Sequence, residues 1–92
     1  MDYKLDGNKL ISRGAKIGYV DSNTVRDGHS SKVGTIDGRC IRDAHGGKVA
    51  DLDGENIRDS HGARIGTMRD VRKVIDGQGG ITLAALWFFF VR

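Results

Sequence analysis

The chain repeats itself every sixteen residues, and this internal repetition constrains its fold more than any other feature does. The segments 20–29, 36–45 and 52–61 align without a gap, and each runs from an aliphatic residue through Asp to Arg-Asp and His. The leading aliphatic residues, Val20, Ile36, Leu52 and Met68, are evenly spaced along the chain. We read the repetition as successive copies of one small structural unit.

Both ends of the chain carry degenerate copies of this unit. The first copy lacks one residue in its loop, and the stretch that follows Met68 repeats this shortened form. Atypical first and last copies are usual in repeat proteins, because they border something other than another repeat. The predicted organisation is a single domain over residues 1–92, with units at about 5–20, 20–36, 36–52, 52–68 and 68–83.

The pattern within a unit predicts β-hairpins. Apolar residues lie at offsets of zero, five and thirteen, which fits no helical stripe, so we expect two short strands per unit, such as 25–27 and 32–36. The Asp-Gly pairs at 6–7, 37–38, 53–54 and 76–77 predict tight turns, since glycine tolerates positive φ. About three apolar positions per unit are too few to cover two faces of a sandwich. We therefore predict an all-β fold of four or five such units, which could stack as an open solenoid or close into a ring. We favour the ring, because closure also removes exposed sheet edges.

A small residue recurs directly after the second-strand aliphatic residue of each unit. It is Gly18, Gly34 and Gly66 in three units and Ala50 in the fourth. A glycine inside a strand usually marks the close approach of another backbone or side chain. We expect something to pack tightly against these positions.

The C-terminal segment 81–91 departs from the repeats. It holds four of the six aromatic residues, Trp87, Phe88, Phe89 and Phe90, and its eleven residues fall short of the roughly 20 that a membrane-spanning helix needs. One interpretation makes it the core element that closes the domain. The alternative is an exposed segment that docks on another copy, another protein or a membrane surface, which would make these four residues partner-binding residues. We favour the core interpretation.

With these residues in view, the chain resembles the four-fold β-flower domain family of small bacterial proteins. The resemblance rests on the form Ile-Asp-Gly-x-x-Ile-Arg-Asp-x-His-Gly-x-Lys-Ile-Gly, as at 36–49 and 52–66, and on the closing residues 84–90. It covers nearly the whole chain. The resemblance implies hairpins arranged about a pseudo-four-fold axis, and it implies no activity, cofactor or substrate.

Two periodic sets of polar residues are candidates for a functional site. The histidines His29, His45 and His61 recur in the same loop, and three converging imidazoles would bind zinc or copper. The alternative is that the loop tips point outward and the histidines are ordinary loop residues. The arginines Arg26, Arg42 and Arg58 are each followed by an aspartate. A rim of arginines could bind phosphates, whereas cross-strand Arg–Asp ladders would explain the same pattern without a ligand.

The sequence favours a non-enzymatic β-repeat module with a structural or interaction role and no cofactor. No catalytic triad, phosphate-binding loop or paired-carboxylate site stands out. The alternative function is polyanion binding, to nucleic acid or acidic glycan, through the repeated arginines, although the net charge of +3 is a mild bias. The single Cys40 and the absence of an apolar N-terminal stretch favour the cytoplasm. If segment 81–91 is exposed rather than core, it would bind an unknown protein partner or a second copy of the chain.

Overall fold

A computed structural model describes residues 2–92, which form ten short strands and three short helical segments. The strands are β1 (Tyr3–Asp6), β2 (Lys9–Ser12), β3 (Ala15–Asp21), β4 (Thr24–Asp27), β5 (Lys32–Asp37), β6 (Cys40–Asp43), β7 (Lys48–Asp53), β8 (Asn56–Asp59), β9 (Arg64–Thr67) and β10 (Ile75–Asp76). The helices are α1 (Met68–Val74), α2 (Ile81–Leu86) and the π-helical segment η1 (Trp87–Val91). The predicted strands around 25–27 and 32–36 are confirmed as β4 and β5.

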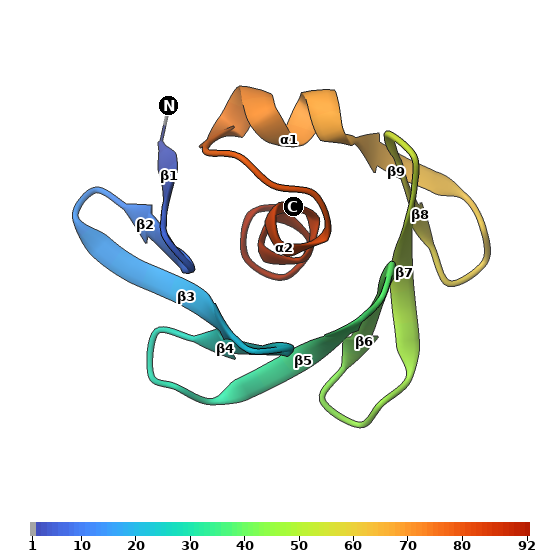
Figure 1. The fold of residues 1–92 in the computed structure, drawn as a ribbon, viewed down its shortest axis with the longest axis horizontal. Helices are drawn as coiled ribbons and strands as arrows, with labels where there is room; N and C mark the ends of the chain where they lie inside the picture. Colours follow the sequence, from blue (N-terminus) through green and yellow to red (C-terminus); the bar gives the residue numbers. More distant parts are fainter. Residues whose placement is uncertain (1) are drawn as a thin grey trace.

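All ten strands belong to one sheet, in the order β10-β1-β2-β3-β4-β5-β6-β7-β8-β9. Neighbouring strands from β1 to β9 are antiparallel, and β10 pairs with β1 in parallel. The sheet curls into a roll, and α2 with η1 runs along its centre (Figure 1). The mostly-β fold of hairpins is therefore confirmed.

The sheet does not close, which corrects the predicted ring. Its edge strands β9 and β10 are not paired with each other, and α1 spans the gap between them (Figure 1). A hairpin was expected over 68–83, but this stretch contains α1, the two-residue β10 and the start of α2. The difference is local: Arg69-Asp70 stands where the other units have Asp-Gly or Asp-Ser, and Asp70 takes part in a helix cap there instead of a turn.

A capping box starts α1 in place of that turn. The Thr67 side chain accepts a hydrogen bond from the backbone N–H of Asp70, and the Asp70 carboxylate accepts one from the backbone N–H of Thr67. This reciprocal pair satisfies two backbone donors at the helix start. Met68 and Val71 are buried on one face of the helix, followed by the buried Ile75. The apolar spacing of three and four residues is that of an amphipathic helix.

The tight turns of the remaining units form as the Asp-Gly pairs predict. Gly7, Gly38 and Gly54 have φ values of 65°, 62° and 62°, and Ser22 takes the equivalent position with φ 57°. The pair Asp76–Gly77 is the exception, because β10 ends there and the chain leads into α2 without a hairpin.

The core lies between the inner face of the sheet and the central helix. Val25, Ile41 and Ile57, one from each of three hairpins, are fully buried together with Leu83 and Leu86 of α2. The C-terminal segment is thus the core element that the sequence analysis favoured. Among residues 2–92, no helix is long and apolar enough to span a membrane.

Candidate functional site: the wide-loop end

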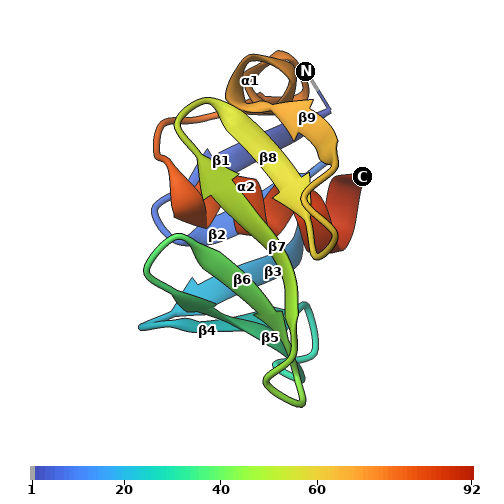
Figure 2. The same cartoon turned by 90° about the vertical axis from the view of Figure 1, so that its right-hand side faces the viewer.

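The hairpin connections lie at two opposite ends of the roll (Figure 2). The tight-turn end carries the two-residue connections 7–8, 22–23, 38–39 and 54–55. The wide-loop end carries the connections 13–14, 28–31, 44–47 and 60–63. The chain's C-terminus lies at the wide-loop end as well (Figure 2). The repeated histidines and arginines singled out from the sequence lie in the wide loops or in the strand residues that lead into them.

An aspartate organises each of the three long loops from within. The Asp43 Oδ1 atom accepts hydrogen bonds from the backbone N–H groups of Gly47 and His45, both at 2.9 Å. Asp27 and Asp59 accept the two equivalent bonds in their own loops. These backbone hydrogen bonds, with a smaller contribution from the neighbouring histidine, lower the pKa of all three carboxyl groups. The three aspartates are therefore part of the loop framework.

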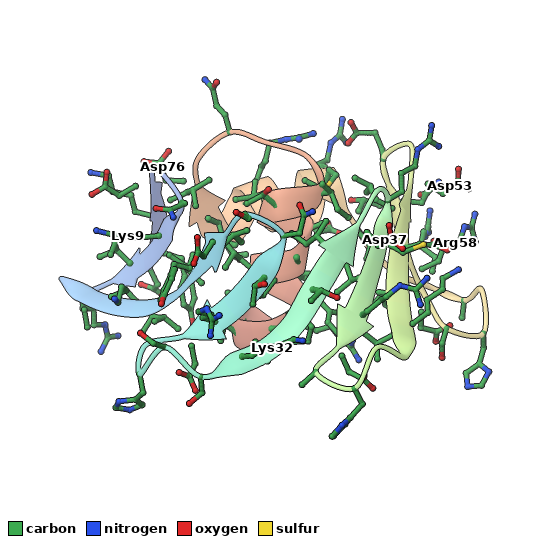
Figure 3. The ribbon with its side chains drawn as sticks, turned by 60° about the horizontal axis from the view of Figure 1, so that its bottom comes forward. Lys9, Lys32, Asp37, Asp53, Arg58 and Asp76 are labelled. Carbon is green, nitrogen blue, oxygen red and sulfur yellow. The ribbon has the colours of Figure 1, made fainter. Side chains whose placement is uncertain are left out.

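The arginine beside each aspartate holds the same loop from the outer face of the sheet. Arg42 Nη1 donates to the Gly46 carbonyl oxygen at 3.1 Å, and its Nε lies 3.4 Å from Asp37 Oδ2. Arg58 repeats both contacts, with Gly62 at 3.1 Å and with Asp53 at 3.4 Å (Figure 3). The arginines pair diagonally across the strands rather than with the aspartates that follow them.

Arg26 differs from the other two arginines. Its Nη1 atom donates to the Ser30 carbonyl oxygen at 3.0 Å, but no carboxylate of residues 2–92 lies within ion-pair distance of its guanidinium. Cross-strand Arg–Asp pairs therefore account for two of the three repeated arginines. The loop carbonyl contact is what all three share.

The three loop histidines do not come together. Their loops belong to different hairpins spread around the roll (Figure 1), and all three residues are exposed. Within residues 2–92, no group of three or more His, Cys, Asp or Glu side chains could hold a metal ion. What the histidines contribute to their loops is a backbone N–H that donates to the preceding aspartate.

The four aromatic residues of the C-terminal segment fill the roll where the small residues leave room. Trp87 packs on Gly66, Phe89 on Gly34 and Phe90 on Gly18, so that any Cβ at these glycines would collide with a ring. At the three glycines, the predicted close approach is thus that of an aromatic side chain. Phe88 lies edge-on to Phe89, with ring centroids 5.3 Å apart, and the Arg92 guanidinium stacks on Phe88 at 4.6 Å. Phe88, Phe89 and Phe90 remain partly exposed.

A third periodic set consists of exposed basic residues at the start of the strands that leave the wide loops. They are Lys16, Lys32, Lys48 and Arg64, again sixteen residues apart. The repeat pattern contains these residues, but sequence reasoning assigned them no functional role, because nothing in the sequence shows that they share one end of the molecule. Lys48 hydrogen-bonds Asp51 at 2.7 Å, which raises the pKa of its ammonium group, and Lys16 lies 4.7 Å from the Tyr19 ring centroid.

The wide-loop end is thus an exposed, positively charged surface around the end of η1. Its lysines and arginines can hold an anionic group by charge and hydrogen bonding at the protein surface. No polar or charged residue of the described chain is buried. A search of protein-family models, of curated proteins and of solved structures finds no match to this chain.

Proposed function

We propose that the chain is a non-enzymatic β-repeat interaction module of the bacterial cytoplasm that binds its partner through the wide-loop end. The observation that carries this proposal is the repetition at that end. Three loops with the same internal hydrogen bonds are each followed by an exposed basic residue at the same position, Lys32, Lys48 or Arg64. A pre-ordered loop loses little conformational entropy on binding, which favours its use as a recognition surface.

The resemblance to the β-flower family belongs to this proposal. We place the four hairpin units, 5–20, 20–36, 36–52 and 52–68, about a pseudo-four-fold axis that runs along the central helix. In such an arrangement, each unit contributes one loop and one basic residue to the same end. The binding surface is then a set of four similar subsites, which suits a partner with repeated groups.

The second candidate function is polyanion binding, favoured by the charge of this end. Lys32, Arg64 and Arg13 make no ion pair within the described chain and are exposed. Asp27 and Asp59, the carboxylates that begin the loops before Lys32 and Arg64, already accept two backbone hydrogen bonds each. Nucleic acid and acidic glycan both present closely spaced anions to which such cations bind with strong salt dependence.

Retention on a duplex-oligonucleotide column tests which face binds. The wide-loop variant Lys32→Gln/Arg64→Gln is compared with a matched variant of the tight-turn end, Lys9→Gln/Arg39→Gln, which removes the same charge. We expect the wild type and the control to be retained at low salt and the wide-loop variant to elute earlier. The slope of log affinity against log salt should fall by about 1.8 for two lost duplex contacts.

The outcomes separate the two candidates. A wild type that is not retained at low salt overturns polyanion binding. Equal loss of retention in both variants overturns the assignment to the wide-loop end. Hydrogen exchange tests the interaction surface itself, since binding of any ligand should protect the loops 28–31, 44–47 and 60–63. Protection confined to the tight turns would contradict the proposal that the module binds through its wide loops.

A further inference from the structure

The strands of the roll carry charge of opposite sign at their two ends. β3, β5 and β7 each have a lysine at or next to their start, Lys16, Lys32 and Lys48, and each ends in an aspartate, Asp21, Asp37 and Asp53. β9 begins with Arg64, and β1 ends with Asp6. Because these strands all run from the wide-loop end to the tight-turn end, the cations line one end and the carboxylates line the other.

The segments at each end extend this separation. The wide-loop segments 12–16, 27–32, 43–48, 59–64 and 88–92 contain six basic and three acidic residues. The tight-turn segments 6–9, 21–24, 37–40, 53–56 and 76–80, together with the start of α1 at 67–72, which the Arg72–Glu55 ion pair places at the same end, contain seven acidic and four basic residues. Figure 3 shows members of the acidic set, Asp37 and Asp53, at the same end of their strands. The module is therefore positive on one end and negative on the other.

The two ends are also the largest faces of the molecule. Its extents are 35 × 28 × 18 Å, and the view down the shortest axis shows the central helix end-on (Figure 1). The roll is thus a thick disc whose faces are its two ends. An ellipse of 35 by 28 Å encloses roughly 770 Å², close to the ~800 Å² per partner of a standard protein interface.

We propose that the partner of the wide-loop end is the tight-turn end of a second copy of this chain, so that copies stack head to tail along the roll axis. This inference rests on the proposed binding face and names its occupant. Each of these strands carries a cation at one end and an aspartate at the other. The spacing between strands therefore sets the spacing of both sets of charges, and the cations of one copy have nearly the spacing of the aspartates of the next. A nucleic acid or a membrane would match the sign of the charge but not this arrangement.

Several members of each ring are available for such contacts. Lys32 and Arg64 at the wide-loop end, and Asp6 and Asp21 at the tight-turn end, are exposed and make no ion pair within the described chain. The tight-turn end also has a hollow of about 410 Å³ beside the start of α2, lined in part by Leu5, Val20 and Ile81. Asn8, Ser22 and Gln78 also line this hollow, so it offers both apolar and polar groups to the partly exposed side chains that end η1 in the next copy.

A head-to-tail contact uses two different surfaces of the molecule, and this determines what solution measurements should show. Such a contact does not close on itself unless the rotation forms a ring, so it produces growing stacks. Exposed ion pairs hold it together, so salt should weaken it: the screening length is about 30 Å at 0.01 M and about 3 Å at 1 M ionic strength. We expect the wild-type mass to rise with concentration at low salt and to fall to that of a monomer at high salt.

Sedimentation velocity on two neutralised variants tests the proposal. The basic-face variant is Lys32→Gln/Arg64→Gln, and the acidic-face variant is Asp6→Asn/Asp21→Asn, in which Asn-Gly preserves the turn at 6–7. Each variant alone should associate about tenfold more weakly than the wild type, from two lost surface pairs. Their equimolar mixture should form a one-to-one complex, because one variant keeps its acidic face and the other keeps its basic face.

Three results would overturn the stacking: a wild type that stays monomeric at low salt, variants that associate as strongly as the wild type, or a mixture with no complex. Circular dichroism shows whether each variant is folded. A misfolded variant is replaced by one that neutralises other residues of the same face, Lys16 and Lys48 on the basic face or Asp37 and Asp53 on the acidic face. Oligonucleotide retention separates this failure from that of the proposed function. A monomeric wild type that is still retained through Lys32 and Arg64 overturns the stacking alone.

Discussion

At the scale of single residues, the glycines that face the helix determine how close the sheet comes to it. A Cβ on Gly34 would collide with the Phe89 ring and with the Arg42 carbonyl oxygen of the neighbouring strand. Ala50 is buried at the corresponding position of another unit, so a Cβ is accommodated there. The repeat pattern could predict a small residue and a close neighbour here, but not which aromatic ring each glycine receives.

We predict that Gly34→Ala destabilises the fold by about 1–3 kcal/mol, the usual cost of overpacking a well-packed core. Neither the backbone carbonyl of Arg42 nor the inward-facing ring of Phe89 can move away freely. The measurement is urea unfolding, with a lower midpoint and an unchanged m-value. Ser31→Ala is the control, since this loop residue is exposed and the hydrogen bonds given for it are made by its backbone, which the substitution keeps. Equal midpoints for the two variants would show that the ring contact has no energetic weight.

At the scale of elements, the sequence was sufficient wherever local chemistry repeats. The Asp-Gly turns and the strands β4 to β8 follow from the pattern, because each hairpin specifies its own turn and its own alternation of buried residues. The same alignment misassigned residues 68–83, since Met68 keeps the aliphatic position while Thr67 and Asp70 form a capping box. At this point the short capping sequence determines the local structure, although the sixteen-residue repeat predicts a hairpin. The open sheet follows from that single substitution of a helix for a hairpin.

The wide loops give a prediction about acid stability. The backbone N–H groups of residues 45 and 47 lower the folded-state pKa of Asp43, and the loops of Asp27 and Asp59 do the same. A carboxyl group of this kind adds stability above its unfolded pKa, about 3.9, and loses it as the pH falls through the lower folded value. We expect the triple variant Asp27→Asn/Asp43→Asn/Asp59→Asn to show a flatter loss of unfolding free energy below about pH 4.

Unfolding in urea at a series of pH values measures this difference. The matched control is Asp6→Asn/Asp21→Asn/Asp76→Asn, which removes three exposed carboxylates that make no ion pair within the described residues. If the wide-loop variant and the wild type lose stability with the same slope below pH 4, the loop hydrogen bonds do not favour the charged carboxylates. The Asn side chains still offer an oxygen to the loop N–H groups, so the comparison isolates the charge.

At the scale of the whole molecule, the central helix distinguishes this fold from an open repeat array. In a solenoid, each repeat contacts only its neighbours and units can unfold separately. Here Val25, Ile41 and Ile57, from three different hairpins, share one core with Leu83 and Leu86. No hairpin can open without exposing the helix, and the helix cannot leave without exposing every hairpin. The sequence could identify segment 81–91 as core from its composition, but its position at the centre follows only from the curl of the whole sheet.

This shared core predicts that the protein unfolds in one cooperative transition. Trp87 is the only tryptophan and lies on the central helix, so its fluorescence reports on the core, while far-UV circular dichroism reports mainly on the sheet. Both probes should give the same urea midpoint and the same m-value. Leu86→Ala should lower both midpoints together, by about 2–5 kcal/mol of unfolding free energy, because this leucine is fully buried. If the far-UV dichroism of the hairpins persisted after Trp87 became exposed, the sheet would be stable without its helix. The hairpins alone would then determine the geometry of the wide-loop end.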